Sequence, residues 1–344
     1  MNFISKTVTF ALSVFAATSC SVFAQVFPSF GGERAGVSLA SSLKIGIGAR
    51  AAALVGTYTA IADDASSVYW NPAGMAESKS NGVLFSQCYW AAGMEHRSAA
   101  AVIRLADGEH NLGFHVAGIF VDPIRVTTEF QPLGTGTTFR YQSLQFSASY
   151  AKRFTDQFSA GITVRYVNEI LGKASLNGIL FDAGTFYRTG LGTSRFAVAV
   201  SNFGGKLTPD GTVPAVGEAP KFNGGQVSSF QSFDPPIIFR IGFATEPVLD
   251  ETHRLTTAIQ LDHPNDNSET ASLGAEYAYT FSAAYPAQVF VRAGVISGAD
   301  DERFAAGAGV FAPFNDDLGV SADYGYSAYS TLGGIHRISV AIKF

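Results

Sequence analysis

Most of the chain after residue 80 alternates apolar and polar side chains with a period of two. Between residues 143 and 150 the even positions are apolar or aromatic and the odd positions are Ser or Gln, and the same alternation recurs in residues 158–166, 255–262 and 318–325. Strict alternation indicates strands with one apolar and one polar face. Each segment has about ten residues, which is the length that a tilted strand needs to cross a bilayer.

Such segments number fourteen, and transmembrane barrels of bacteria have an even number of strands. They lie near residues 82–90, 97–106, 109–121, 139–152, 156–168, 176–188, 193–203, 236–248, 252–263, 269–281, 287–297, 303–313, 316–326 and 333–344. Every second connection is a tight turn, and the two long loops, 122–138 and 204–235, both fall among the others. Short turns on one side and longer loops on the other are typical of such barrels. The sequence predicts an all-β fold, a 14-stranded antiparallel transmembrane barrel over residues 81–344.

Composition agrees with a wall that faces lipid. Only 15% of the residues are charged, whereas Gly (36) and Phe (29) are abundant. The net charge of −5 argues against a nucleic-acid partner, which would require a basic face. Residues 338–344 alternate and end on Phe344, as the recognition signal of outer-membrane barrels does. The alternative is the edge strand of a soluble sandwich, which fits the low charge and the fourteen long strands poorly.

Residues 1–24 have the features of a signal peptide. Lys6 precedes an apolar run over residues 8–17, and Val22-Phe23-Ala24 forms a small-x-Ala cleavage site. Export to the cell outer membrane of a Gram-negative-type bacterium is the expectation. Lipidation at Cys20 is an alternative, although the usual Leu is missing before it. Cleavage after Ala24 would leave Cys88 as the only cysteine and would exclude an intrachain disulfide.

Residues 25–80 lack the strand pattern and are predicted to form a plug inside the barrel. Alanine and glycine crowd the segment from Gly46 to Ala76, and residues 50–62 would suit a short helix in a confined space. Asp63-Asp64 is a plausible start for a second helix, because an Asp side chain can cap free N–H groups. Asn71-Pro72 should end that helix, because the residue before a proline is pushed out of the α region.

If the apolar faces point to lipid, the opposite faces carry charged residues into the lumen. These are Arg165, Asp182, Arg240, Asp262, Glu276, Arg292, Asp323 and Arg337. One interpretation is a polar path or a latch that holds the plug. The other, which we weight more heavily, is structural pairing, because unpaired buried charges are costly.

No catalytic or cofactor motif in the sequence has the structural context that it requires. Residues 46–51 match a dinucleotide G-x-G-x-x-A pattern, but no βαβ unit surrounds them. The acidic loop 262–269 lacks the glycine and the spacing of an EF-hand. The six histidines show no metal-binding spacing, and there is no nucleophile elbow. We therefore expect no enzyme activity, no cofactor and no metal.

The plug sequence resembles the PorV/PorQ group of outer-membrane proteins, which is related to FadL-type transporters. The resemblance lies in Gly48–Leu54, Thr59–Ala65, Tyr69–Ala76 and the closing strand His336–Phe344. It implies a barrel with an N-terminal hatch whose motif includes Asp63, Asp64, Trp70, Asn71 and Pro72. One departure is Val55, which stands where that group usually has a second glycine; another is the modest size of most outer loops.

The resemblance implies two functions. PorV-like proteins serve the type IX secretion system, so the first hypothesis is a component that binds exported cargo proteins and other secretion subunits, with loop 204–235 as the contact surface. The alternative is a FadL-like gated channel for a hydrophobic small-molecule ligand. A purely structural barrel is the third possibility. All three share outer-membrane lipid as a partner.

Overall fold

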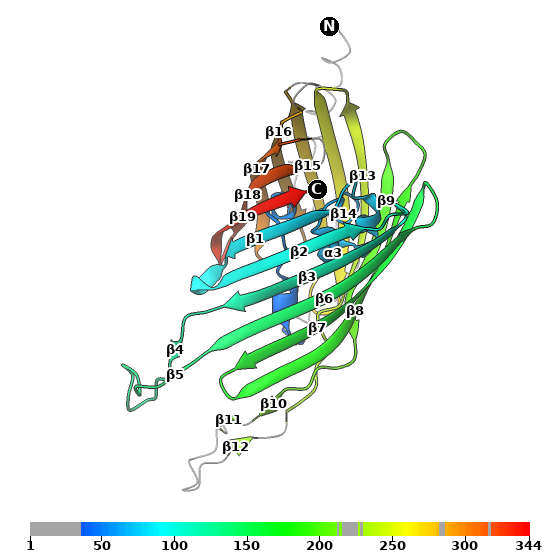
Figure 1. Ribbon diagram of the computed structural model, residues 1–344. Helices are drawn as coiled ribbons and strands as arrows, with labels where there is room; N and C mark the ends of the chain where they lie inside the picture. Colours follow the sequence, from blue (N-terminus) through cyan, green and yellow to red (C-terminus); the bar gives the residue numbers. More distant parts are fainter. Residues whose placement is uncertain (1–35, 212, 215–225, 228–229, 282–285, 316–317) are drawn as a thin grey trace. The chain divides into compact units, whose positions relative to one another are not determined.

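The computed structural model describes residues 36–344 except 212, 215–225, 228–229, 282–285 and 316–317. The predicted signal peptide and Cys20 therefore lie outside the described residues. Fourteen long antiparallel strands form the wall (Figure 1). They are β1 (Gly82–Tyr89), β2 (Glu95–Arg104), β3 (His110–Phe120), β6 (Tyr141–Arg153), β7 (Phe158–Leu171), β8 (Ala174–Arg188), β9 (Arg195–Gly204), β13 (Ile238–Leu249), β14 (His253–Pro264), β15 (Thr270–Thr280), β16 (Gln288–Ser297), β17 (Glu302–Pro313), β18 (Gly319–Tyr329) and β19 (Gly333–Lys343).

The strands close into a barrel. Each pairs with its neighbours in the sequence, β1 pairs with β19, and β9 pairs with β13 across the long connection. The β8–β9 ladder contains a register shift, where Asn202 adopts a left-handed conformation (φ 62°). The prediction of a closed 14-stranded barrel is confirmed.

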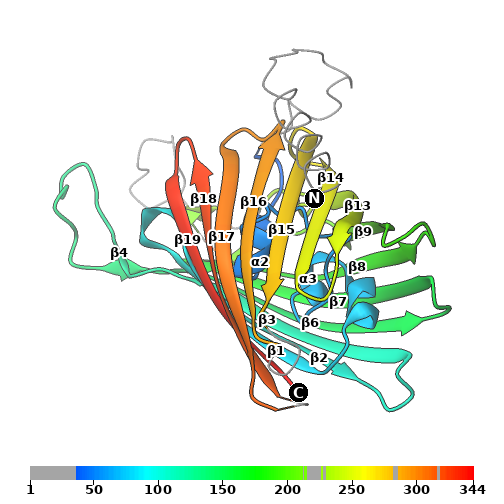
Figure 2. The same cartoon turned by 90° about the horizontal axis from the view of Figure 1, so that it is seen from above.

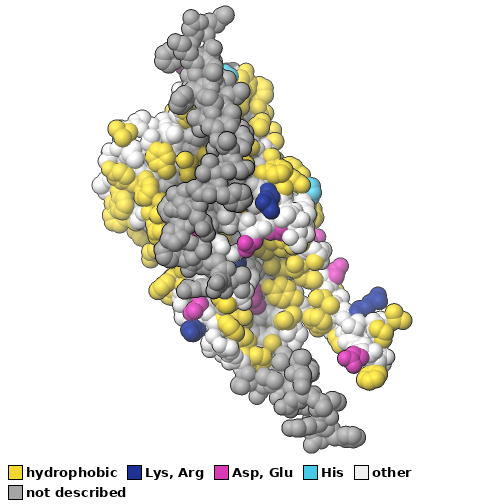
Figure 3. All heavy atoms as spheres, turned by 180° about the vertical axis from the view of Figure 1, so that it is seen from behind, with side chains coloured by type: hydrophobic (Ala, Val, Ile, Leu, Met, Phe, Trp, Pro, Cys, Tyr) yellow, Lys and Arg dark blue, Asp and Glu magenta, His cyan; other side chains and the backbone are white. Residues whose placement is uncertain are grey.

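The two faces of the wall differ as the alternation predicted. On β6 the side chains of Phe146 and Tyr150 point outward and are exposed, whereas those of Ser147 and Ser149 point inward and are buried. The same division runs around the barrel. In Figure 3 hydrophobic side chains predominate over charged ones on the visible described surface. A belt of this kind is suited to lipid.

The two ends of the barrel carry different connections. At the turn end lie the short β2–β3, β6–β7, β8–β9 and β13–β14 connections and the C-terminus. At the loop end lie both long connections. One holds the hairpin of β4 (Ile124–Arg125) and β5 (Thr138–Phe139), which projects away from the wall (Figure 1). The other holds β10 (Asp210–Gly211), β11 (Val213–Pro214) and β12 (Gln226–Val227).

The described part of the plug runs through the barrel interior in short helical pieces (Figure 2). These are η1 (Ser41–Lys44), α2 (Ala49–Ala52), α3 (Ser67–Trp70) and η2 (Pro72–Glu77); a further short helix, η3 (Ala91–Gly93), lies in the β1–β2 loop. A short helix does form at the start of the segment 50–62, but it has only four residues. The helix ends at Ala52 because Val55 (φ 50°) and Gly56 (φ 74°) adopt left-handed conformations. No helix in the described part of the chain is long and apolar enough to cross a membrane.

Candidate functional site: the plug and its contacts with the barrel wall

Inward-facing glycines seat the plug against the wall. Three cross-strand pairs contact it: Gly161 with Gly184, Gly274 with Gly294, and Gly307 with Gly325. A Cβ added at Gly161 would lie 2.6 Å from the carbonyl carbon of Pro72, and one at Gly294 would lie 2.7 Å from that of Leu54. No side chain fits in these gaps, so plug backbone packs directly on strand backbone. The alternation of side chains does not predict these glycine contacts with the plug, although glycine at inward positions in the middle of several strands is a visible sequence signal for them.

The first half of the plug, residues 49–62, is held by buried hydrogen bonds. The Gln260 Oε1 atom accepts from the backbone N–H groups of Tyr58 (3.0 Å) and Thr59 (2.9 Å), and its Nε2 atom donates to the Gly56 carbonyl (3.0 Å). The Thr57 hydroxyl donates to Ser272 on β15 at 2.8 Å. Gln260 is fully buried, so one side chain satisfies three backbone groups that have no helix partner.

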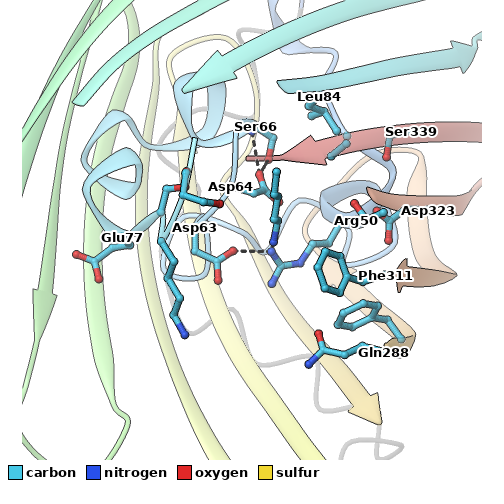
Figure 4. A pocket seen from close by; sticks show the side chains of 18 of the residues that line it. Arg50, Asp63, Asp64, Ser66, Glu77, Leu84, Gln288, Phe311, Asp323 and Ser339 are labelled. Carbon is cyan, nitrogen blue, oxygen red and sulfur yellow. Dashed lines mark hydrogen bonds and ion pairs between the residues drawn. The ribbon is translucent and has the colours of Figure 1, made fainter. Parts of the chain in front are cut away.

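Arg50 is the centre of an ion-pair network beside this half. Its Nε and Nη2 atoms donate to the two Glu276 carboxylate oxygens (2.8 and 3.0 Å), and Nη1 donates to Asp63 at 2.6 Å (Figure 4). Glu276 also accepts from Arg292 at 2.6 Å, and Arg292 donates to Asp323 at 2.5 Å. Bidentate pairs of arginine with carboxylate are the strong form of this interaction. The network joins the plug to β15, β16 and β18.

Asp63 and Asp64 connect the two halves of the plug through Arg50. Asp64 accepts from the Ser66 backbone N–H (2.8 Å) and the Tyr58 hydroxyl (2.7 Å). Burial raises the pKa of the Asp63 carboxyl, but Arg50 and Lys343 together lower it by more, so its pKa lies below the ordinary value. Asp63 therefore remains ionised, and paired with Arg50, at neutral pH.

The second half of the plug, residues 66–77, packs against β2, β3 and β6–β8. The Asn71 Nδ2 atom donates to the Thr59 carbonyl (3.1 Å) and to the Thr185 carbonyl of β8 (3.2 Å). Glu77 closes this half at the turn end, where it pairs with Arg188, whose side chain is 56% exposed. The Glu77 side chain itself is only 5% exposed and also accepts from the Ser159 hydroxyl at 3.1 Å, so a buried carboxylate ties this half to an exposed arginine of the rim.

Two of the remaining predicted lumen arginines lie over the aromatic rings of the plug residues Tyr69 and Trp70. Arg165 pairs with Asp182 at 2.5 Å, fully buried, and lies over the Tyr69 ring at 5.4 Å. Arg240 lies over the Trp70 ring at 5.6 Å. It donates to Ser201 at 2.8 Å and is 3.8 Å from the Asp262 carboxylate. Arg337 stands apart from these pairs and donates to the Cys88 sulfur at 3.4 Å.

The five hatch residues named from the sequence thus lie in the plug core or beside Arg50. The Trp70 Nε1 atom donates to the Ile47 carbonyl at 3.0 Å, and Pro72 begins η2. The eight lumen charges all lie on the inner face, most of them buried. They form separate pairs and one network. Our sequence analysis did not single out Arg50, Gln260 or Glu77, because nothing in the strand pattern says which polar side chain reaches the plug.

Two further regions of the interior have a defined character. At the turn end a cavity of about 330 Å³ lies between the plug and β16–β19, with Arg50, Asp63 and Asp323 on its surface (Figure 4). Toward the loop end Leu39, Ala40 and Leu43 form a buried apolar cluster with wall and loop residues Val167, Leu176, Leu180 and Leu207. Within the described residues, no group of acidic, His or Cys side chains is arranged to hold a metal.

Comparison with known proteins identifies the fold. No protein-family model matches the sequence, and no curated protein matches it. Among solved structures, the toluene transporter TbuX of Ralstonia pickettii is 13% identical with a TM-score of 0.55, over 86% of this chain and 97% of that one. The monoaromatic hydrocarbon channel CymD is 13% identical with a TM-score of 0.57, over 87% and 98%. A FadL homologue of Pseudomonas aeruginosa is 11% identical with a TM-score of 0.53, over 86% and 97%.

The fold is that of FadL-like outer-membrane transporters. At this level of identity the likeness establishes architecture, namely a 14-stranded barrel with an N-terminal segment of small helices. The matched structures are channels and transporters rather than enzymes.

Proposed function

We propose that the protein is an outer-membrane channel for small hydrophobic molecules, closed by its plug. The observation that carries this is the apolar cluster in the loop-end half of the lumen, where Leu39 and Leu43 of the chain's own N-terminal segment pack on Val167 and Leu180. The loop end would face the cell exterior. Structures of the same fold are described as toluene and monoaromatic hydrocarbon transporters, which supports an apolar permeant.

The cluster offers an entry site. A hydrophobic molecule would displace Leu39 and Leu43 and bury its surface against Leu180, gaining about 25 cal/mol per Å² of apolar area. Passage beyond this point requires the plug to shift, because Tyr69 and Trp70 fill the lumen between Arg165 and Arg240.

Equilibrium binding of naphthalene to the purified protein in detergent tests this function. Leu180→Asn should weaken binding about tenfold or more, because a buried leucine contributes roughly 1.5–3 kcal/mol. Leu191→Asn is the matched control, since Leu191 is 77% exposed in the β8–β9 turn. Absence of naphthalene binding to the wild-type protein, or equal loss in both variants, would refute the apolar site.

A second candidate is the secretion component of the PorV/PorQ type, and the projecting β4–β5 hairpin favours it. Phe130 and Leu133 near its tip are 94% and 91% exposed, the highest values among the large hydrophobic residues that the structure describes. Such a tip is suited to a pocket on a protein partner. Of the other proposed contact surface, loop 204–235, residues 212, 215–225 and 228–229 lie outside the described part.

Purification from native membranes with mass spectrometry tests this candidate. A type IX secretion subunit or cargo protein recovered at near-equal amounts, and lost with Phe130→Ser/Leu133→Ser, would support it. Equal recovery of the partner protein with the variant would show that the hairpin does not bind it.

A further inference from the structure

The wall that contacts the second half of the plug is polar along its inner face. His115 of β3 lies opposite Ser147 of β6, and Ser147 lies opposite Arg165 of β7, so the three side chains form one row across the strands. The next row toward the turn end is Ser149, Thr163 and Asp182. We refer to these six residues as the polar rows. The inner face of an outer-membrane barrel becomes the lining of a channel wherever the lumen opens.

Several of these polar groups have no protein partner when the plug is in place. Among the described residues, neither ring nitrogen of His115 nor the Ser147 hydroxyl has a hydrogen-bond partner, although both side chains are buried. His115 instead meets the edge of Tyr69, with ring centroids 6.1 Å apart. The Ser67 hydroxyl, on the plug's α3, is also buried and unpartnered. Each such group gives up its hydration without a replacing hydrogen bond while the plug is in place.

The first half of the plug shows the opposite arrangement. On the wall side, its backbone groups are matched by the buried Gln260 and Arg50 is matched by the buried Glu276, although the Thr59 hydroxyl of this half is buried without a described partner. Displacing that half would break these satisfied bonds. Displacing the second half would hydrate groups that now lack partners, and it would break the bonds of Asn71 and the rim contacts of Glu77. The unpartnered wall groups of His115 and Ser147 would therefore gain hydration when residues 66–77 leave, at the cost of exposing buried apolar side chains such as Met75.

We propose that residues 66–77 move away from β2–β7 while residues 49–62 stay bound, and that the exposed polar rows line a hydrated route for small uncharged hydroxyl-bearing solutes. This goes beyond the channel for hydrophobic molecules, which uses the apolar cluster at Leu180. Arg165 is neutralised by Asp182, so the rows offer hydrogen-bond donors and acceptors without net charge. Polyols and small sugars fit that chemistry.

Two engineered disulfide bonds, called locks here, each fix one half of the plug to the wall, so that the two halves can be tested separately. Val68→Cys/Gly113→Cys, made together with Met75→Ala, would tie the second half to β3, because a Cβ built at Gly113 lies 2.5 Å from the Val68 Cγ1 atom and would otherwise overlap the Met75 sulfur. Thr57→Cys/Ser272→Cys would tie the first half to β15, because the two hydroxyl oxygens are 2.8 Å apart. Both are made with Cys88→Ser so that no other thiol is present in the mature chain. Heat-modifiable migration on gels verifies that each barrel is folded.

The measurement is the swelling rate of proteoliposomes in iso-osmotic erythritol, oxidised and then reduced. The oxidised second-half lock should reduce swelling to the rate of protein-free liposomes, and dithiothreitol should restore it. The oxidised first-half lock should swell as fast as its reduced form. The proposal is overturned if wild-type liposomes do not swell, if the first-half lock alone stops swelling, or if the second-half lock leaves it unchanged.

His115→Leu tests the polar rows themselves. It keeps the ring-sized volume but removes both unpartnered nitrogens, so it should slow erythritol swelling by stabilising the closed plug and by removing a polar lining group. Swelling equal to or faster than that of the wild-type protein would contradict the role of the rows.

Discussion

The two halves of the plug are similar in length, yet they are bound to the barrel in different ways. Residues 49–62 rest on β13–β19 through Gln260 and Glu276, both buried and fully paired. Residues 66–77 rest on β2–β8 through glycine seats, the Asn71 amide and a rim of partly exposed charges. The comparison teaches that one plug can be held in two ways, by a buried bidentate ion pair in one half and by glycine seats and a carboxylate that reaches an exposed arginine in the other.

The largest effect should come from Glu276→Gln, which removes the buried carboxylate that Arg50 and Arg292 share and leaves them only their pairs with Asp63 and Asp323. Breaking a buried ion pair costs about 3–5 kcal/mol. Hydrogen exchange of the Tyr58 and Thr59 backbone amides, which Gln260 covers, should report the loosened first half. Glu95→Gln is the control, because Glu95 pairs with an exposed Arg97 and its loss should leave that exchange unchanged.

An intermediate effect is expected from Gly184→Ala. The added methyl group would overlap the Asn71 Oδ1 atom, forcing the second half off its seat at a cost of about 1–3 kcal/mol. Gly205→Ala is matched, since nothing lies within 4 Å of a Cβ there and its φ is ordinary. Raised erythritol permeation in Gly184→Ala alone is the expected result; equal permeation would show that the seat does not hold the plug.

The smallest effect should be the dependence on acid. The pKa of Asp63 is below its ordinary value, so its contribution is complete above that ordinary value and is lost as pH falls through the folded pKa. Trp70 fluorescence should therefore be constant from neutral pH down to about pH 4 and change only below it. In Asp63→Asn the change below pH 4 should be smaller. A transition near neutral pH would contradict the pairing of Asp63 with Arg50.

Much of the fold followed from the sequence because each strand carries its own period-two pattern, and the parity of long and short connections confirms the count independently. The plug was harder. Its course depends on Val55, a β-branched residue in a left-handed conformation that only the surrounding contacts maintain. The resemblance to the PorV/PorQ group marks Val55 as a departure from glycine. No local pattern predicts that α2 ends at Ala52, just before this residue.

The site was less predictable than the fold for a similar reason. The inward position of Glu276 could be inferred from alternation, but its partner Arg50 lies 226 residues away and depends on how the plug enters the barrel. Gln260 looks like any inward polar residue until the plug backbone is placed against it. The paired glycines require the strand register, which alternation alone does not give.

Hydrogen exchange of backbone amides in residues 49–62 and 66–77, followed by mass spectrometry of the protein in nanodiscs, tests the central contrast most directly. The account predicts slow exchange in the first half, where Gln260 covers the Tyr58 and Thr59 amides, and markedly faster exchange in the second half. Equal protection in both halves, or faster exchange in the first, would contradict it.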